Sequence, residues 1–193
     1  MQEDEGFWDF YWETRLQPME NLGKREAILA ASRLIRRLSR QSGRPLRVLE
    51  PGCGEGQVIG TLVDGLAPYC DANVVVGIDY LPQSIARCRR DFPGLQFLDG
   101  DFTDPALLDR LQQYDLILLV NALHEVFSAG YSEDLGEVDV PAAKQRVERA
   151  LSSLVAKLVP GGWLLLFDGL EPAGDPTERL QVRFLDRLVR DDF

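Results

Sequence analysis

The sequence lacks the residues that a metal centre or a disulfide framework requires. Histidine occurs once in 193 residues, and the three cysteines, Cys53, Cys70 and Cys88, are widely spaced with no CxxC pair. An odd, scattered set of cysteines is typical of a reduced cytoplasmic protein. We therefore expect no disulfide and no metal site.

Basic residues and long apolar runs are also scarce. Lys and Arg total 21 against 31 Asp and Glu, which gives a net charge of −10 without any run of Lys or Arg. Nucleic acid is disfavoured as a partner, because phosphate binding needs a basic surface. No apolar stretch reaches the roughly 18 residues of a membrane helix, and the acidic start MQEDEG is not a signal peptide. We expect no membrane span and a cytoplasmic location.

Short apolar runs alternate with amphipathic stretches along most of the chain. Strands are expected at 47–49, 74–78, 96–98, 116–120 and 163–167. Helices are expected over 57–66, 83–92, 105–113, 141–158 and 177–190. This alternation predicts an α/β fold with a doubly wound, mostly parallel sheet.

The first 44 residues are expected to be helical. Apolar residues recur at three- and four-residue intervals over 24–41, and an aromatic segment, FWDFYWETRL, precedes them. We divide the chain into an N-terminal helical cap, 1–44, and a domain over 45–193. The aromatic face of the first segment fits either a lid over a ligand or packing on the edge of the sheet.

A glycine-rich loop follows the first strand, in the stretch RVLEPGCGEG at 47–56. Gly52, Gly54 and Gly56 allow the backbone to turn at positive φ and to approach a ligand closely. The dinucleotide motif GxGxxG requires a third glycine where this chain has Gln57. The spacing is instead GxGxG, with Glu50 two residues ahead of it.

Polar residues follow the next three strands as well. Asp79 ends the second strand, Asp101 follows the third in a short turn, and NALH at 121–124 follows the fourth. Ligands bind beyond the carboxyl ends of the strands in open α/β sheets, so these residues are expected around one site. Asp101 has a structural alternative, which is to initiate the next helix, whereas Asp79 has no packing reason to end its strand.

Together these motifs resemble class I S-adenosylmethionine-dependent methyltransferases over about residues 45–168. The resemblance implies a Rossmann-like fold of strand order 3-2-1-4-5, S-adenosylmethionine as cofactor and S-adenosylhomocysteine as product. It also implies in-line methyl transfer to an O, N or C nucleophile of a small-molecule acceptor. The alternatives are a regulatory module that binds the cofactor without transferring methyl groups, and a nicotinamide-dependent oxidoreductase, which Gln57 disfavours.

The resemblance also implies where the cofactor lies. The glycine loop, Glu50 and Asn121 would face the methionine moiety, Asp79 the ribose hydroxyls, and the residues after the second and third strands the adenine. Arg15 would pair with the methionine carboxylate. The full set of implied cofactor-binding residues is Glu50, Gly52, Gly54, Gly56, Gln57, Asp79, Tyr80, Leu81, Asp101, Phe102, Asn121 and Arg15.

His124 is the candidate general base, because it follows the fourth strand near the expected position of the methyl group. Glu125 is the second choice, and a passive wall residue is the alternative role for His124. The stretch 127–140 is acidic, contains glycine and shows no periodicity, so we expect it to contact the acceptor.

The chain departs from the family pattern at its end. The family continues past the fifth helix with two more strands, which are apparently absent from this chain. The strand at 163–167 would then be an apolar edge, which natural proteins avoid. We expect a second copy or the continuation of a longer chain to cover it.

Overall fold

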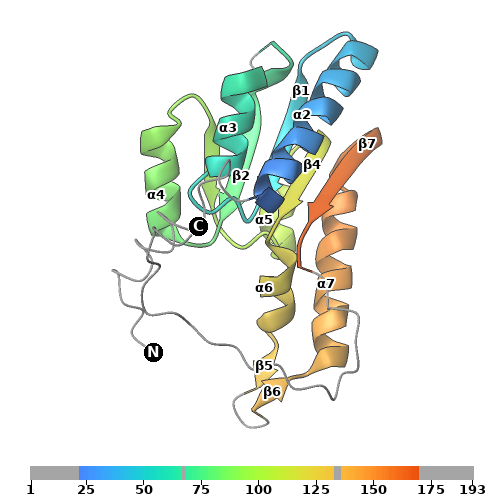
Figure 1. Ribbon diagram of the computed structural model, residues 1–193. Coiled ribbons are helices and arrows are strands. Elements are labelled where there is room, and N and C mark those ends of the chain that lie inside the picture. Colours follow the sequence, from blue (N-terminus) through green and yellow to red (C-terminus); the bar gives the residue numbers. More distant parts are fainter. Residues whose placement is uncertain (1–21, 67, 133–135, 170–193) are drawn as a thin grey trace, which may run out of the picture.

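Five parallel strands form the central sheet of the computed structural model, which describes residues 22–66, 68–132 and 136–169 (Figure 1). Their order is β3-β2-β1-β4-β7, and every neighbouring pair is parallel. This confirms the predicted order 3-2-1-4-5. The strands are β1 (Leu46–Pro51), β2 (Cys70–Asp79), β3 (Gln96–Asp99), β4 (Tyr114–Val120) and β7 (Leu158–Phe167).

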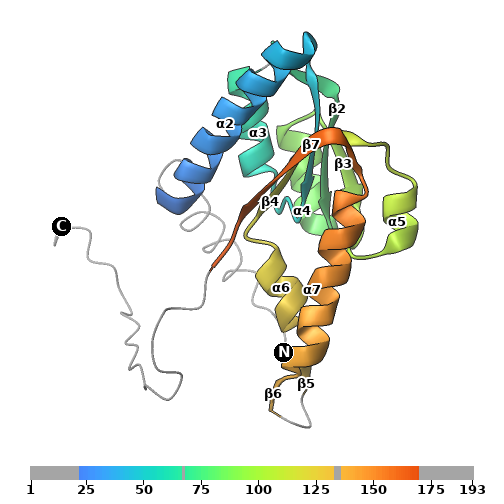
Figure 2. The same cartoon turned by 90° about the vertical axis from the view of Figure 1, so that its right-hand side faces the viewer.

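Helices cover both faces of this sheet and make a three-layer sandwich, which Figure 2 shows with the sheet between the helices. One face carries α2 (Leu22–Ser42), α3 (Gln57–Leu66) and α4 (Pro82–Asp91). The other carries α5 (Pro105–Asp109), α6 (Leu123–Ser128) and α7 (Val140–Val155). All seven residues of β4 are buried, as its central position between two helical layers requires.

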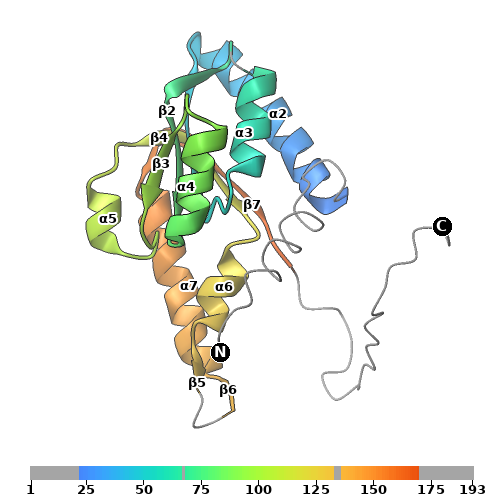
Figure 3. The ribbon, with the colours of Figure 1, turned by 90° about the vertical axis from the view of Figure 1, so that its left-hand side faces the viewer.

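The helix α2 packs on the sheet beside α3, as Figure 3 shows from the other side. Its residues Ile28, Ala31 and Ile35 belong to the same buried cluster as the inner residues of β1 and β4. The described part of the predicted N-terminal cap therefore shares the core of the sheet. The domain boundary at residue 44 stays a prediction, and the aromatic segment before residue 22 and the helix predicted over 177–190 lie outside the described residues.

The stretch after β4 contains more regular structure than the sequence indicated. It forms α6 and a small antiparallel pair, β5 (Tyr131–Ser132) with β6 (Glu137–Val138), at the bottom of Figure 1. A six-residue helix and two-residue strands are too short to produce a detectable period. The lack of periodicity over 127–140 therefore did not indicate these elements.

Several predicted boundaries also shift. The helix predicted over 105–113 ends at Asp109, and the helix predicted over 141–158 ends at Val155. β7 begins at Leu158, before the VPGGW turn, because Leu158 already pairs with Tyr114. The pairing then moves to Leu116 with Trp163, so the intervening residues of β7 bulge out of the ladder, with Gly161 at φ 79°.

The strand β7 lies at one edge of the described sheet. Trp163 and Leu166 on it are 44% and 50% exposed. That another chain or further sequence covers this edge stays a prediction. The described helices include none with the length and apolar character needed to cross a bilayer, and the cytoplasmic location also stays a prediction.

Candidate active site

The glycine loop joins the end of β1 to the start of α3 and comes very close to the loop after β4. Gly52, Gly54 and Gly56 have φ of 70°, 54° and 75°, values at which side chains other than glycine are strained. A Cβ on Gly52 would lie 2.7 Å from the Cβ of Ala122. The sequence therefore needs glycine at position 52 for both its conformation and its packing.

Glu50, near the end of β1, is buried beneath this loop. Its Oε2 accepts a hydrogen bond of 3.0 Å from the Ile59 N–H, in the first turn of α3. Burial raises the pKa of Glu50 to about 8, against the opposing effects of the Ile59 hydrogen bond and the Lys24 charge. The carboxylate thus stabilises the helix start and also lines the cavity described below.

Lys24 is a site residue that the sequence reasoning missed. It is 7% exposed, lines the cavity and interacts electrostatically with Glu50, while burial lowers its pKa. A usable signal was present, because Lys24 precedes Ile28, Ala31 and Ile35 at helical spacing and so lies on the buried face of α2.

Asp79 ends β2 directly beside the glycine loop. Its Oδ2 accepts from the Gly54 N–H at 2.8 Å and its Oδ1 from the Leu81 N–H at 3.0 Å. Burial raises the pKa of Asp79, opposed by the backbone hydrogen bonds from Leu81, Gly54 and Tyr80. A carboxylate has about four acceptor positions, so these donors leave at least one for a ligand hydroxyl.

Asp101 follows β3 in a tight turn. Its Oδ1 accepts from both the backbone N–H and the hydroxyl of Thr103, each at 2.7 Å. The helix start that Asp101 could have provided belongs to Asp104, whose side chain accepts from the Ala106 N–H. Asp101 is exposed and lines the cavity, with Oδ2 outside these bonds.

His124 is the second residue of α6 and pairs with Asp168, the residue immediately after β7. Its Nδ1 lies 2.8 Å from Asp168 Oδ1, and Asp168 Oδ2 also accepts from the backbone N–H groups of Leu123 and His124. Burial tends to raise the pKa of Asp168. The hydrogen bonds from Gly169 and His124 outweigh this effect and hold the pKa below its usual value. The sequence reasoning did not single out Asp168, although the strand-end rule that selected Asp79 also applies to it.

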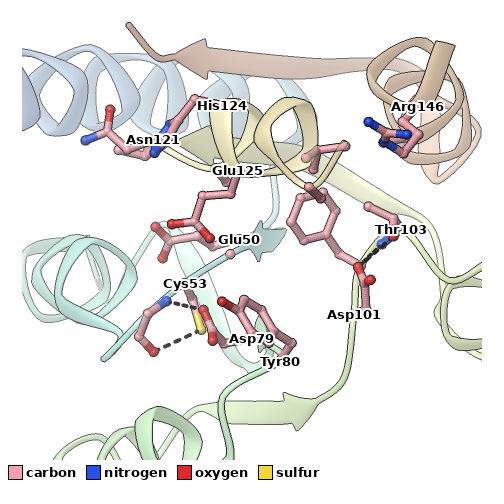
Figure 4. A pocket seen from close by; sticks show the side chains of 18 of the residues that line it. Glu50, Cys53, Asp79, Tyr80, Asp101, Thr103, Asn121, His124, Glu125 and Arg146 are labelled. Atoms are coloured by element: carbon pink, nitrogen blue, oxygen red, sulfur yellow. Dashed lines mark hydrogen bonds between the residues drawn. The ribbon is translucent and has the colours of Figure 1, made fainter. Parts of the chain in front are cut away.

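The residues that follow β1 to β4 surround one cavity of about 1540 Å³ at the carboxyl edge of the sheet. Figure 4 shows Glu50, Asp79 and Tyr80 facing this space from one side and Glu125 from the other. Burial raises the pKa of Glu125. Of the predicted residues, the cavity brings together Glu50, Gly52, Gly54, Gln57, Asp79, Tyr80, Leu81, Asp101, Phe102, Asn121, His124 and Glu125.

Two predicted residues are not among those lining the cavity. Gly56 packs behind the loop instead, where a Cβ would lie 3.1 Å from the Cys88 sulfur. Arg15 lies outside the described residues. From the described part of 127–140, Ala129 lines the cavity.

Comparisons with solved structures show the same fold. A SAM-bound amino pentose methyltransferase from Micromonospora echinaspora, CalS10, matches with a TM-score of 0.55 and 21% identity, over 76% of this chain and 52% of that one. The sugar N-methyltransferase KedS8 from Streptoalloteichus sp ATCC 53650 matches with a TM-score of 0.52 and 18% identity, over 81% of this chain and 51% of that one. The chain thus spans about half the length of these two structures.

Sequence comparisons give the family. A non-reducing polyketide synthase from Aspergillus terreus, tazA, is 34% identical over 100 residues, which are 50% of this chain and 4% of the synthase. The family model described as "Methyltransferase domain" matches residues 48–162, from β1 into β7. The chain therefore belongs to the methyltransferase domain family, as a member of the class I S-adenosylmethionine-dependent methyltransferases that its glycine loop and strand-end residues predicted.

Proposed function

We propose that this chain transfers a methyl group from S-adenosylmethionine to an O, N or C nucleophile of a small-molecule acceptor. The observation that carries the proposal is the single cavity that joins the four strand ends to His124. Its volume of about 1540 Å³ exceeds the roughly 300–1,000 Å³ of a usual ligand pocket. The cavity therefore has room for an acceptor beside the cofactor.

The described residues fit the proposed cofactor. Asp79 retains acceptor capacity for a ribose hydroxyl, and the positive φ of Gly52 lets the backbone approach a ligand. Tyr80 lines the cavity and is 59% exposed, and from this position its ring would flank the adenine. The glycine loop, Glu50 and Asn121 would hold the methionine end, with Leu81, Asp101 and Phe102 around the adenine.

When bound, S-adenosylmethionine supplies a methyl group already activated by the sulfonium centre. The protein's main task is then to hold the nucleophile close and aligned, which can contribute several kcal/mol without acid or base catalysis.

His124 would act as the general base where the acceptor carries a proton. Because Asp168 is ionised at neutral pH, it accepts from Nδ1–H and leaves Nε2 of His124 with a free lone pair. The His124 side chain is 55% exposed at the cavity, whereas Asp168 is 12% exposed. In this arrangement Asp168 orients the ring and stabilises the cation that forms when Nε2 takes a proton.

The test combines cofactor binding with turnover. Calorimetry measures binding of S-adenosylmethionine, and mass spectrometry follows methylation of a panel of phenols, amino sugars and β-dicarbonyl compounds. Amino sugars and polyketide-like compounds enter the panel because the relatives include a sugar N-methyltransferase and a polyketide synthase. Binding together with transfer supports the proposal. Binding without transfer to any member would select a regulatory module instead.

A further inference from the structure

Arg146, on α7, carries two buried donors that nothing in the described structure satisfies. Its Nε and Nη2 are shielded from solvent and have no hydrogen-bond partner. The guanidinium lies against Gly130, just past the end of α6, where a Cβ would overlap Nη2. Unsatisfied buried donors are rare in proteins and lower the stability of the fold. The two buried nitrogens of Arg146 therefore require an explanation.

The other basic residues on the cavity wall differ from Arg146. Lys24 is coupled electrostatically to Glu50, and Arg149 is exposed and donates from Nε to the Gln145 carbonyl. Arg146 lines the cavity and makes no ion pair within the described residues, and its remaining nitrogen, Nη1, is not among the shielded atoms. The described part of the wall therefore presents a guanidinium without a counter-ion.

The position of Arg146 indicates which ligand would supply that counter-ion. Arg146 and Thr103 both line the cavity and are drawn on the right of Figure 4, whereas Asn121 and Glu50 are drawn on the left, where the methionine end is proposed to lie. The methionine carboxylate is the only anionic group of S-adenosylmethionine. An anion beside Arg146 therefore belongs to the second ligand.

We propose that Arg146 binds a carboxylate or phosphate group of the acceptor, at the end remote from the atom that is methylated. This inference rests on the proposed function, because it assigns the acceptor to this cavity. The anion meets Nη1 first. A turn of the side chain away from Gly130 then brings a second guanidinium nitrogen to the anion, which makes the bidentate pair that guanidinium groups form with these anions.

The test compares Arg146→Met with Lys144→Met, which removes an exposed positive charge from the same helix. Calorimetry on protein saturated with S-adenosylhomocysteine measures the binding of 3-(4-hydroxyphenyl)propionate, of the corresponding alcohol, and of the phosphate ester of that alcohol. We expect at least one charged probe to bind about tenfold more tightly than the alcohol. Whether the propionate or the phosphate ester binds more tightly distinguishes the two anions.

Arg146→Met should abolish this preference, and Lys144→Met should retain it. Arg146→Met should also raise Tm by at least about 2 °C in the absence of probe, because it removes two unsatisfied buried donors. Equal affinity of the wild-type protein for the three probes would overturn the proposal. A lower Tm of Arg146→Met, together with an unchanged preference of that variant for the charged probe, would also overturn it. An anion preference without methyl transfer to any acceptor would instead overturn the proposed function and leave the Arg146 site standing.

Discussion

Replacing Glu50 with glutamine should change how the stability of the protein depends on pH. Burial raises the pKa of Glu50 from 4.5 to about 8 in the folded protein. Between these values the folded protein holds a proton that the unfolded chain releases. The free energy of unfolding therefore falls as pH rises through this window, and the loss is complete above pH 8.

The magnitude follows from the size of the shift. Each pH unit between 4.5 and about 8 removes about 1.4 kcal/mol, so the full contribution is about 5 kcal/mol. This is a large part of the roughly 5–15 kcal/mol by which a domain is stable. Glutamine keeps an oxygen that can accept from the Ile59 N–H, and it is uncharged at every pH.

Urea unfolding followed by circular dichroism, at intervals from about pH 5 to about pH 9, measures this effect. Near pH 5 Glu50→Gln and wild-type protein should be about equally stable, and by pH 8 the variant should be more stable by several kcal/mol. Glu26→Gln, at an exposed position of α2, controls for the loss of one negative charge. Parallel stability curves for Glu50→Gln and wild-type protein would refute the argument.

Further substitutions test the site and the packing of its glycine loop. Asp79→Ala should weaken S-adenosylmethionine binding at least about tenfold in calorimetry, because the ribose loses a charged acceptor, and unchanged affinity would remove Asp79 from the site. His124→Ala and Asp168→Asn should each lower kcat by about 10²–10⁴-fold with little change in cofactor affinity, and full activity of either variant would exclude the pair as a base. Gly52→Ala should cost about 2–5 kcal/mol in denaturant unfolding, since it adds strain at positive φ and a close contact. Gly65→Ala, inside α3 with open space around it, should instead stabilise by up to about 1 kcal/mol, and equal effects of the two changes would contradict the packing argument.

The sheet and most of the cavity wall could be predicted because they follow from simple rules. Strands buried on both faces are continuous apolar runs in the sequence. The polar residues that follow these strands meet at the carboxyl edge of the sheet. Asp79 and His124 were found in this way, and both lie at the cavity. Asp168 obeys the same rule and was missed, because the rule was applied only to the residues after the first four strands.

Other features depend on contacts that a linear pattern does not contain. The pairing of Leu158 with Tyr114 extends β7 across a glycine turn. That turn is a bulge within β7 because the residues on both sides of it pair with β4. The helix α6 is six residues long, and its first N–H groups are satisfied from β7 rather than by a local capping residue. Likewise, the burial of the Arg146 guanidinium depends on its packing against Gly130, a contact between two elements that the sequence pattern does not indicate.

The contacts of Asp168 make the end of β7 and the start of α6 a single cooperative unit. Asn121 donates its backbone N–H to the Phe167 carbonyl at 2.7 Å, and Leu123 donates to Asp168 at 2.8 Å. If β7 detaches from the sheet, these two amides lose their acceptors, and His124 loses its partner Asp168 at the same time. Their hydrogen exchange should therefore proceed through one shared opening. A ligand or chain that secured the edge strand would slow that exchange and hold His124 in place.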